Sequence, residues 1–253
     1  ESFARIIYER KSTAFCKLYH HIRLVAPTDM TVLILGKTGT GKEHLADKIH
    51  KQSLRANKPY IKVDCGSLSK ELSASAFFGH TKGAFTGATE EKAGYFQEAQ
   101  GGTLFMDEVE NLPMEIQQML LRAIEERRYR PVGAGQDRRV DVRIIVATNE
   151  DLQQAVVERR FRKDLLFRFQ DFTLVVPSLH DCLEDILPLA DFFRRQSCAQ
   201  LRKEVEDFDE MAKKILLEYD WSGNVRELKQ VVQASVLICE GKVITPQYLQ
   251  LKR

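Results

Sequence analysis

The sequence predicts an α/β domain built on a parallel sheet, followed by a smaller all-helical domain. Short apolar segments with the length and β-branched content of buried parallel strands recur through the first 176 residues. Helical patterns lie between these segments, as the connections of a parallel sheet require. After Pro177 the strand pattern ends and only helical patterns follow. We therefore expect residues 1–178 to form the α/β domain and residues 179–253 the helical domain.

The predicted elements alternate in a regular order. The expected strands are residues 31–35, 60–63, 103–106, 142–147 and 172–176. Between them, residues 42–53 and 114–126 carry apolar side chains at helical spacing, and Pro113 stands where a helix commonly begins. The helices expected in the second domain are residues 183–196, 209–219 and 224–239.

The composition bounds the class of protein. The chain has 253 residues, is 43% hydrophobic and carries 38 basic and 36 acidic residues, a balance that does not indicate a dedicated nucleic-acid or membrane surface. The arginines between residues 127 and 143 could face nucleic acid or a partner protein, but we prefer a solvated hairpin with ion pairs between subunits.

The cysteines and the chain ends bear on location. Five scattered cysteines without CxxC spacing argue against disulfides or zinc and predict a cytoplasmic protein. No apolar stretch reaches the roughly 18 residues that span a bilayer. Because the chain opens with Glu1 and shows no signal peptide, we expect a fragment of a longer protein.

A glycine-rich segment follows the first predicted strand and opens a helix. Glycines let backbone N–H groups turn toward phosphates, the helix N-terminus adds a favourable dipole, and Lys42 adds a positive charge. The alternative is a glycine-rich turn with a chance lysine, which the strand, the spacing and the helix together disfavour. The predicted phosphate loop consists of Gly36, Lys37, Thr38, Gly39, Thr40, Gly41 and Lys42.

Glu43 follows Lys42 where a serine or threonine commonly helps to hold Mg²⁺. Its carboxylate could reach the metal through water, or it could cap the helix N-terminus. The sequence leaves both alternatives open.

Two acids end the third predicted strand. In a parallel sheet, Asp107 and Glu108 would emerge at the carboxyl edge, where ligands bind. Asp107 is the natural Mg²⁺ ligand, and Glu108 is the natural base for an attacking water. Two solvated acids in a turn are the alternative, but the phosphate loop favours the catalytic interpretation.

A compact glycine-hinged loop with a central aromatic residue and a hydroxyl lies between these motifs. An exposed phenylalanine at a loop tip usually contacts a partner, although a turn with a tucked phenylalanine is also possible. The loop consists of Gly83, Ala84, Phe85, Thr86, Gly87 and Ala88.

This GAFTGA sequence strongly resembles the loop that defines the sigma-54-dependent transcription activators, a family of AAA+ ATPases. The phosphate loop and the GGTLFMDEVENLP segment resemble the family's two nucleotide motifs. VRIIVATN resembles its sensor I strand, FRKDLLFRF its arginine-finger segment, and WSGNVREL its sensor II helix. The resemblance covers nearly the whole chain, with the motifs in the expected order.

The resemblance implies a P-loop AAA+ core with a helical lid, which binds ATP and Mg²⁺ between neighbours in a ring of six or seven subunits. It implies that Asn149 senses the γ-phosphate and that Arg162 and Arg168 are fingers for the neighbouring nucleotide, although solvated arginines are the alternative. Arg226 would be the sensor II arginine in the first turn of a helix that Asn224 can cap, although a surface charge near Glu227 is the alternative. Ile6 and Ile7 would pack on adenine, although core packing explains them equally well.

The resemblance also implies a partner and a departure. Phe85 and Thr86 would contact sigma-54 in its RNA polymerase holoenzyme and drive promoter opening, while DNA is bound mainly by a separate domain and no membrane is involved. Asp64 stands where the family often has an asparagine that restrains the catalytic glutamate. A carboxylate there would repel Glu108 unless a proton is shared, so we expect altered nucleotide gating.

Two other classes of function compete with this interpretation. An AAA+ machine with another protein client is disfavoured by the intact GAFTGA loop. A regulator that binds nucleotide without turnover is disfavoured by Lys42, Asp107, Glu108 and Arg162, although Asp64 leaves it some room.

Overall fold

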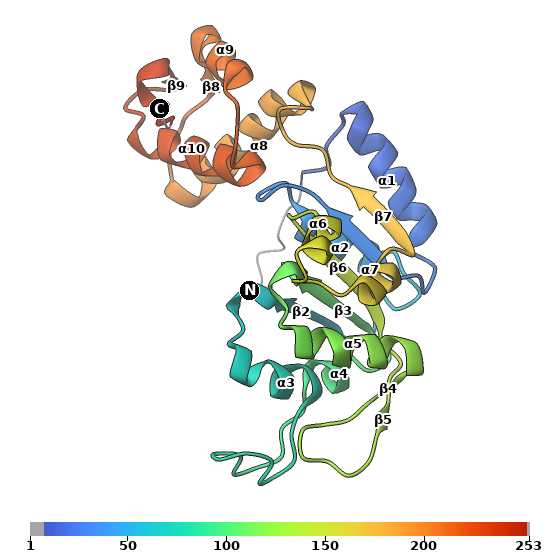
Figure 1. Cartoon of the computed structure of the whole chain (residues 1–253). Helices are drawn as coiled ribbons and strands as arrows, with labels where there is room; N and C mark the ends of the chain where they lie inside the picture. Colours follow the sequence, from blue (N-terminus) through green and yellow to red (C-terminus); the bar gives the residue numbers. More distant parts are fainter. Residues whose placement is uncertain (1–7, 252–253) are drawn as a thin grey trace. The chain divides into compact units, whose positions relative to one another are not determined.

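The computed structural model describes residues 8–251, which form two compact units (Figure 1). We call residues 20–36 and 42–175 the core unit, and residues 8–19, 37–41 and 176–251 the lid unit. Across residues 8–251, no helix combines the length and the apolar character needed to cross a membrane.

The core unit is built on a five-stranded parallel sheet with the strand order β2-β3-β6-β1-β7. Each strand lies within one or two residues of its predicted position, and β1, β3 and β6 are buried, as expected when helices cover both faces. The predicted α/β class is confirmed. The strands are β1 (Val32–Leu35), β2 (Tyr60–Asp64), β3 (Thr103–Asp107), β6 (Arg143–Thr148) and β7 (Phe172–Val175).

The helices of the core unit include the two predicted ones, α2 (Lys42–Lys51) and α5 (Met114–Glu126), and several short ones that the pattern did not predict. The amphipathic pattern of α5 buries Ile116, Leu120 and Ala123 against the sheet. The remaining helices are α3 (Lys70–Phe78), α4 (Tyr95–Glu98), α6 (Leu152–Val157), α7 (Lys163–Phe169) and α1 (Thr13–Val25), which contributes residues to both units.

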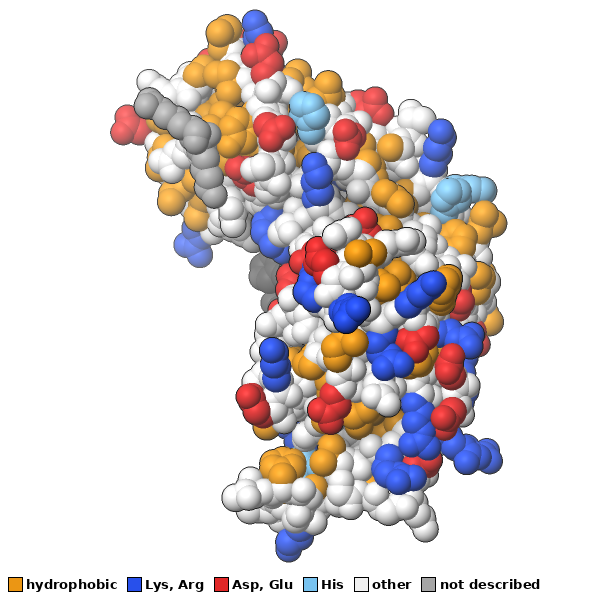
Figure 2. Space-filling view, viewed as in Figure 1, with side chains coloured by type: hydrophobic (Ala, Val, Ile, Leu, Met, Phe, Trp, Pro, Cys, Tyr) orange, Lys and Arg blue, Asp and Glu red, His pale blue; other side chains and the backbone are white. Residues whose placement is uncertain are grey.

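The arginine-rich segment forms a short antiparallel hairpin from β4 (Arg128–Tyr129) and β5 (Arg138–Arg139). Asp137 accepts hydrogen bonds from Arg122 and Arg130, so these ion pairs lie within the chain. The ion pairs expected between subunits stay a prediction. Basic and acidic side chains lie intermingled on the side of the core unit that carries this hairpin (Figure 2).

Arg143 corrects the expectation of solvated arginines. It lies in the centre of the sheet, 2% exposed, and donates hydrogen bonds to the carbonyl oxygens of Val25 and Ala26 at the end of α1. Burial lowers the pKa of its guanidinium to about 10. Val25 ends α1, and its carbonyl also accepts from the N–H and the hydroxyl of Thr28, so Arg143 and Thr28 together cap α1.

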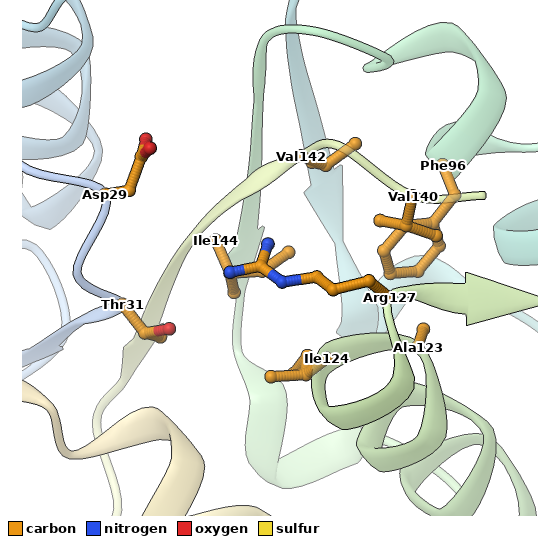
Figure 3. A pocket seen from close by; sticks show the side chains of 9 residues that line it. All are labelled: Asp29, Thr31, Phe96, Ala123, Ile124, Arg127, Val140, Val142 and Ile144. Atoms are coloured by element: carbon orange, nitrogen blue, oxygen red, sulfur yellow. The ribbon is translucent and has the colours of Figure 1, made fainter.

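A narrow cavity, lined by apolar side chains together with Asp29, Thr31 and Arg127, lies between the sheet and α5. Its volume of about 20 Å³ has room for a single water molecule and none for a nucleotide. Figure 3 shows the Arg127 side chain extending past Ile144 toward the side of Asp29 and Thr31. The cavity is therefore a packing feature and not the nucleotide site.

The lid unit is mainly helical, as predicted. It contains α8 (Leu183–Leu201), α9 (Glu210–Glu218) and α10 (Asn224–Ile238), and Asp209 caps α9 by accepting from the Ala212 N–H. Trp221, 1% exposed, lies in its apolar core and donates from Nε1 to the Leu216 carbonyl. A parallel pair of two-residue strands, β8 (Asp207–Phe208) and β9 (Val243–Ile244), is an addition that the sequence did not predict.

A buried ion pair joins the N-terminal segment to α8 within the lid unit. Asp185, 1% exposed, accepts from Arg10 Nε at 2.8 Å and from the backbone N–H groups of Lys11 and Ser12. The Arg10 guanidinium also lies 3.6 Å from the centroid of the Phe15 ring. One carboxylate thus satisfies the charge of Arg10 and the donors that precede α1.

We predict that Asp185→Ala lowers the free energy of unfolding of the lid unit by about 3–5 kcal/mol, because it leaves the Arg10 charge buried without a partner. Urea unfolding followed by the fluorescence of Trp221, the single tryptophan, measures this loss. The control is Glu184→Ala, which removes an exposed acid bonded only to the Thr13 N–H and should cost about 1 kcal/mol or less. Equal losses from the two variants would contradict the prediction.

Candidate nucleotide site

The phosphate loop joins β1 to α2, as the sequence predicts. Lys42 begins α2, is 8% exposed, and donates from Nζ to the Gly36 carbonyl at 2.7 Å. Gly39 and Gly41 have φ values of 78° and 95°, which side chains rarely adopt, so the path of the loop depends on glycine there. Thr40 donates to the Lys37 carbonyl and closes the turn, while Lys37 and Thr38 are exposed.

Glu43 has a contact that neither sequence alternative included. Its carboxylate pairs with Lys62 on β2 at 3.0 Å, and Lys62 also contacts Asp47 at 2.7 Å. Glu43 and Lys62 are both substantially exposed, so this pair contributes little to stability. Glu43 still lies in the first turn of α2, where a negative charge is favourable.

The parallel register brings the acids together at the carboxyl edge of the sheet. Asp64 at the end of β2 is the register partner of Asp107 at the end of β3. Glu108 follows in a left-handed conformation with φ of 54°, and its N–H donates to Asp107 Oδ1 at 2.9 Å. A residue forced into this conformation is frequently part of a functional site.

Gly66 lets the Glu108 carboxylate approach Asp64. A Cβ atom at Gly66 would lie 2.3 Å from Glu108 Oε2 and 3.3 Å from Asp64 Oδ1, so the two carboxylates flank the space that the glycine leaves open. Asn111 donates to Glu108 Oε2 at 3.3 Å, and Asp64 accepts from the Gly66 N–H at 2.9 Å. Sequence reasoning missed Gly66 and Asn111, since only the fold brings them beside Glu108.

Burial and neighbouring charges shift the pKa values of the acids at this edge. Burial raises the pKa of Glu108, and the charges of Asp64, Asp107 and Glu110 raise it further. Burial also raises the pKa of Asp107, while the Glu108 N–H and Lys42 lower it. A cation bound here would therefore be stabilised by several carboxylates that repel one another in its absence.

Asn149 and the phosphate loop adjoin this edge. Asn149 immediately follows β6, whose last residue, Thr148, accepts from the Gly36 N–H at 3.3 Å. The order of the strands places β6 between β3 and β1, so Asn149 follows the strand that separates the acids from the phosphate loop. This is the arrangement in which open α/β sheets bind ligands.

The two candidate finger arginines lie on the surface of the core unit. Arg162 precedes α7 and forms two hydrogen bonds to Asp164, at 3.0 and 2.8 Å, while its N–H donates to Gln117 Oε1. Arg168, at the end of α7, pairs with Glu125 on α5 at 2.8 Å. The side chains of Arg162 and Arg168 are 30% and 54% exposed.

Arg226 lies in the first turn of α10, as predicted, and its N–H donates to the Gly39 carbonyl at 3.3 Å. The prediction that Asn224 caps this helix is wrong. Asn224 accepts from the Leu179 N–H and donates to the Thr38 carbonyl, so its amide holds the phosphate-loop segment of the lid unit. Glu227 satisfies the start of the helix by accepting from the Gly223 N–H. Ile6 and Ile7 lie outside the described residues.

The GAFTGA loop projects beyond α3, beside the loop that joins β4 and β5 (Figure 1). The Thr81 N–H donates to the Val132 carbonyl, which ties the two loops together at their base. Within the loop, the Gly83 N–H donates to the Ala88 carbonyl and the Ala88 N–H to the Phe85 carbonyl. Phe85 is 39% exposed, and Thr86 is exposed at the tip.

Comparison with known proteins gives the class of this chain. Residues 8–175 match the family model described as sigma-54 interaction domain, and residues 181–252 match the model described as AAA+ ATPase lid domain. The chain therefore belongs to the sigma-54 interaction domain family of AAA+ proteins, and the resemblance inferred from the sequence is confirmed.

Among its relatives, the transcriptional regulatory protein ZraR of Klebsiella oxytoca is 44% identical over 240 residues, which cover 95% of this chain and 54% of ZraR. The alginate biosynthesis transcriptional regulatory protein AlgB of Pseudomonas aeruginosa is 42% identical over 241 residues, with the same coverage. NtrX of Brucella abortus in complex with ATP has a TM-score of 0.90 and 32% identity, over 97% of this chain and 54% of NtrX. The chain thus spans about half the length of these relatives.

We predict that Lys42→Ala lowers the affinity for ATP at least about tenfold, because it removes a buried charge at the start of α2. Titration with a fluorescent ATP analogue measures the change. Lys51→Ala is the matched control, since it removes an exposed lysine from the other end of the same helix and should leave the affinity near the wild-type value. Wild-type affinity in Lys42→Ala would contradict the assignment of this loop.

Proposed function

We propose that this chain is an ATP-hydrolysing ring domain that contacts sigma-54 RNA polymerase holoenzyme through its GAFTGA loop and drives open-complex formation. The observation that carries the proposal is that the core unit contains both the carboxyl edge with Asp107 and Glu108 and an exposed aromatic loop, which α3 connects to that edge. In this proposal, residues 1–178 contribute the chemistry and residues 179–253 form a lid that carries Arg226.

In the proposed reaction, Lys42 binds the β and γ phosphates and Glu108 polarises the attacking water. Among residues 8–251, no group of three or more acidic, histidine or cysteine side chains forms a metal site by itself. This suits Mg²⁺, which is commonly bound through one or two carboxylates together with substrate phosphates. Asp107 would be its protein ligand, and the ion would neutralise charge on the phosphates.

The surface arginines support a ring. A guanidinium at the surface of one subunit can reach a nucleotide on a neighbouring subunit. Arg162, just before α7, and Arg168, at the end of α7, both have such a position. We propose a ring of six or seven subunits in which Arg162 and Arg168 stabilise charge on the neighbouring subunit's nucleotide and Asn149 senses the γ-phosphate. DNA would be bound mainly by a separate domain of the longer protein.

Co-elution with sigma-54 tests the proposed partner. The chain should form a complex with sigma-54 in the presence of ADP and a metal fluoride, which mimic the transition state, and no stable complex without them. Thr86→Ala, at the exposed tip of the loop, should abolish the complex while ATP turnover continues.

The opposite result is equally informative. An assembled ring that hydrolyses ATP but forms no complex with sigma-54 would support an AAA+ machine with another protein client. Nucleotide binding without turnover would support a non-catalytic regulator.

Asp64 generates a second prediction. Its carboxylate cannot donate a hydrogen bond to Glu108 while both are charged, whereas an amide at this position can. We predict that Asp64→Asn lowers ATP turnover about tenfold, since a hydrogen bond to a charged group would restrain Glu108. Steady-state turnover across ATP concentrations measures the effect, and Asp64→Ala separates loss of charge from gain of a donor. Unchanged turnover and unchanged nucleotide dependence in Asp64→Asn would contradict the prediction.

A further inference from the structure

Phe85 is folded back onto the base of its own loop. Its ring lies edge-on to the His80 imidazole, with 4.9 Å between the ring centroids and an interplanar angle of 65°. Among residues 8–251, His80 is the one ring that Phe85 contacts. An edge-to-face aromatic pair of this kind is favourable beyond the area that it buries. Phe85 therefore has a preferred position in which part of its surface is withheld from a partner.

His80 is a fixed anchor. It is 9% exposed, and its backbone exchanges hydrogen bonds with Lys92 in both directions at 3.0 Å. Its Nδ1 lies 2.6 Å from Ser75 Oγ on α3, which sets the orientation of the imidazole. Gly79, just before it, has φ of 74°, and a Cβ there would lie 2.5 Å from the Lys92 carbonyl oxygen. The backbone at His80 is therefore packed too closely against Lys92 to move separately from it.

The loop tip is free to move by comparison. Gly83 and Gly87 flank Phe85 with φ values of 79° and 99°, and a Cβ at either glycine would meet no atom within 4 Å. At the base, Gly133 packs closely against the loop, because a Cβ there would lie 2.7 Å from the Ala84 Cβ and 2.8 Å from Thr81 Oγ1. A rotation about these glycines can lift Phe85 from His80 once the loop's own hydrogen bonds, from the Gly83 N–H to the Ala88 carbonyl and from the Ala88 N–H to the Phe85 carbonyl, break or rearrange.

We propose that His80 is a positioning residue whose imidazole holds Phe85 in the folded-back position and so limits partner binding until the ring is released. Ser75 makes the anchor responsive to α3, because a movement of α3 carries the imidazole with it. This inference rests on the proposed function for the identity of the partner, but the contact between His80 and Phe85 can be tested without any partner.

The first experiment measures the release of the ring by itself. The tryptophan introduced by Phe85→Trp reports exposure through acrylamide quenching, against the weak background of buried Trp221. Adding His80→Leu should raise the quenching constant about twofold, and adding His80→Phe, which keeps an aromatic ring, should raise it less. Equal quenching constants with histidine and leucine at position 80 would overturn the proposal.

The second experiment measures the consequence for binding. In the chain with native Phe85, His80→Leu should raise the affinity for labelled sigma-54 in the absence of nucleotide about two- to tenfold, the range expected for one aromatic pair. Affinity with ADP and metal fluoride should stay near the wild-type value, so the gain from nucleotide becomes smaller. A loss of affinity by the same factor in both states would indicate a merely structural role and overturn the proposal.

Ser75→Ala is the milder variant, since it removes the bond to Nδ1 and leaves the imidazole in place. It should change quenching and affinity in the same direction as His80→Leu by a smaller factor, and a change in the opposite direction would contradict the anchoring role of Ser75. Increased quenching in His80→Leu together with no sigma-54 binding in any variant would uphold the contact and refute the proposed function. A wild-type quenching constant in the His80→Leu variant, together with normal nucleotide-gated binding of sigma-54, would refute the anchoring by His80 and support the proposed function.

Discussion

The parallel register of the central sheet is the constraint on which the candidate site depends. Since β2, β3, β6 and β1 run in the same direction, the residues that follow them collect at one edge, although they are far apart in the chain. The hydrogen bond from Gly36 to Thr148 joins the phosphate loop to this edge. The same register also places Asp64 directly beside Asp107, a pair of like charges that destabilises the sheet. An arrangement that is costly to the fold but suited to a cation and phosphates is typical of a functional site.

The chain connects this edge to the GAFTGA loop by a single continuous path. The segment after Asp64 forms a short turn, Cys65–Ser67, and then α3, which ends at the closely packed Gly79. Rigid helices transmit displacement, whereas flexible loops absorb it. α3 is therefore the segment through which a change at Asp64 and Glu108 would reach His80. Beyond His80, Gly83 and Gly87 allow the few residues of the GAFTGA loop to move.

The sequence predicted the features that local pattern determines. Strand positions, the start of α2 and α5, and the phosphate loop follow from hydrophobic periodicity, Pro113 and glycine spacing. Contacts between distant segments could not be predicted in this way. Asn224 has the residue type of a helix cap, yet its amide forms hydrogen bonds to Leu179 and Thr38. Arg143 lies within an arginine-rich segment, yet its side chain is buried in the sheet. The short helix α3 was missed because its small and apolar residues show no amphipathic period.

Burial separates the arginines of this chain into two kinds. Arg10 and Arg143 are buried. Arg10 Nε donates to Asp185 and Arg143 donates to backbone carbonyls, so removing these partners would be costly. Arg162 and Arg168 pair with Asp164 and Glu125 at the surface, where such pairs are worth about 0–1 kcal/mol. Exchanging these acids for a phosphate on a neighbouring subunit therefore costs little. The surface pairs hold the two guanidinium groups in place in the single chain without preventing the contact that the proposed ring requires.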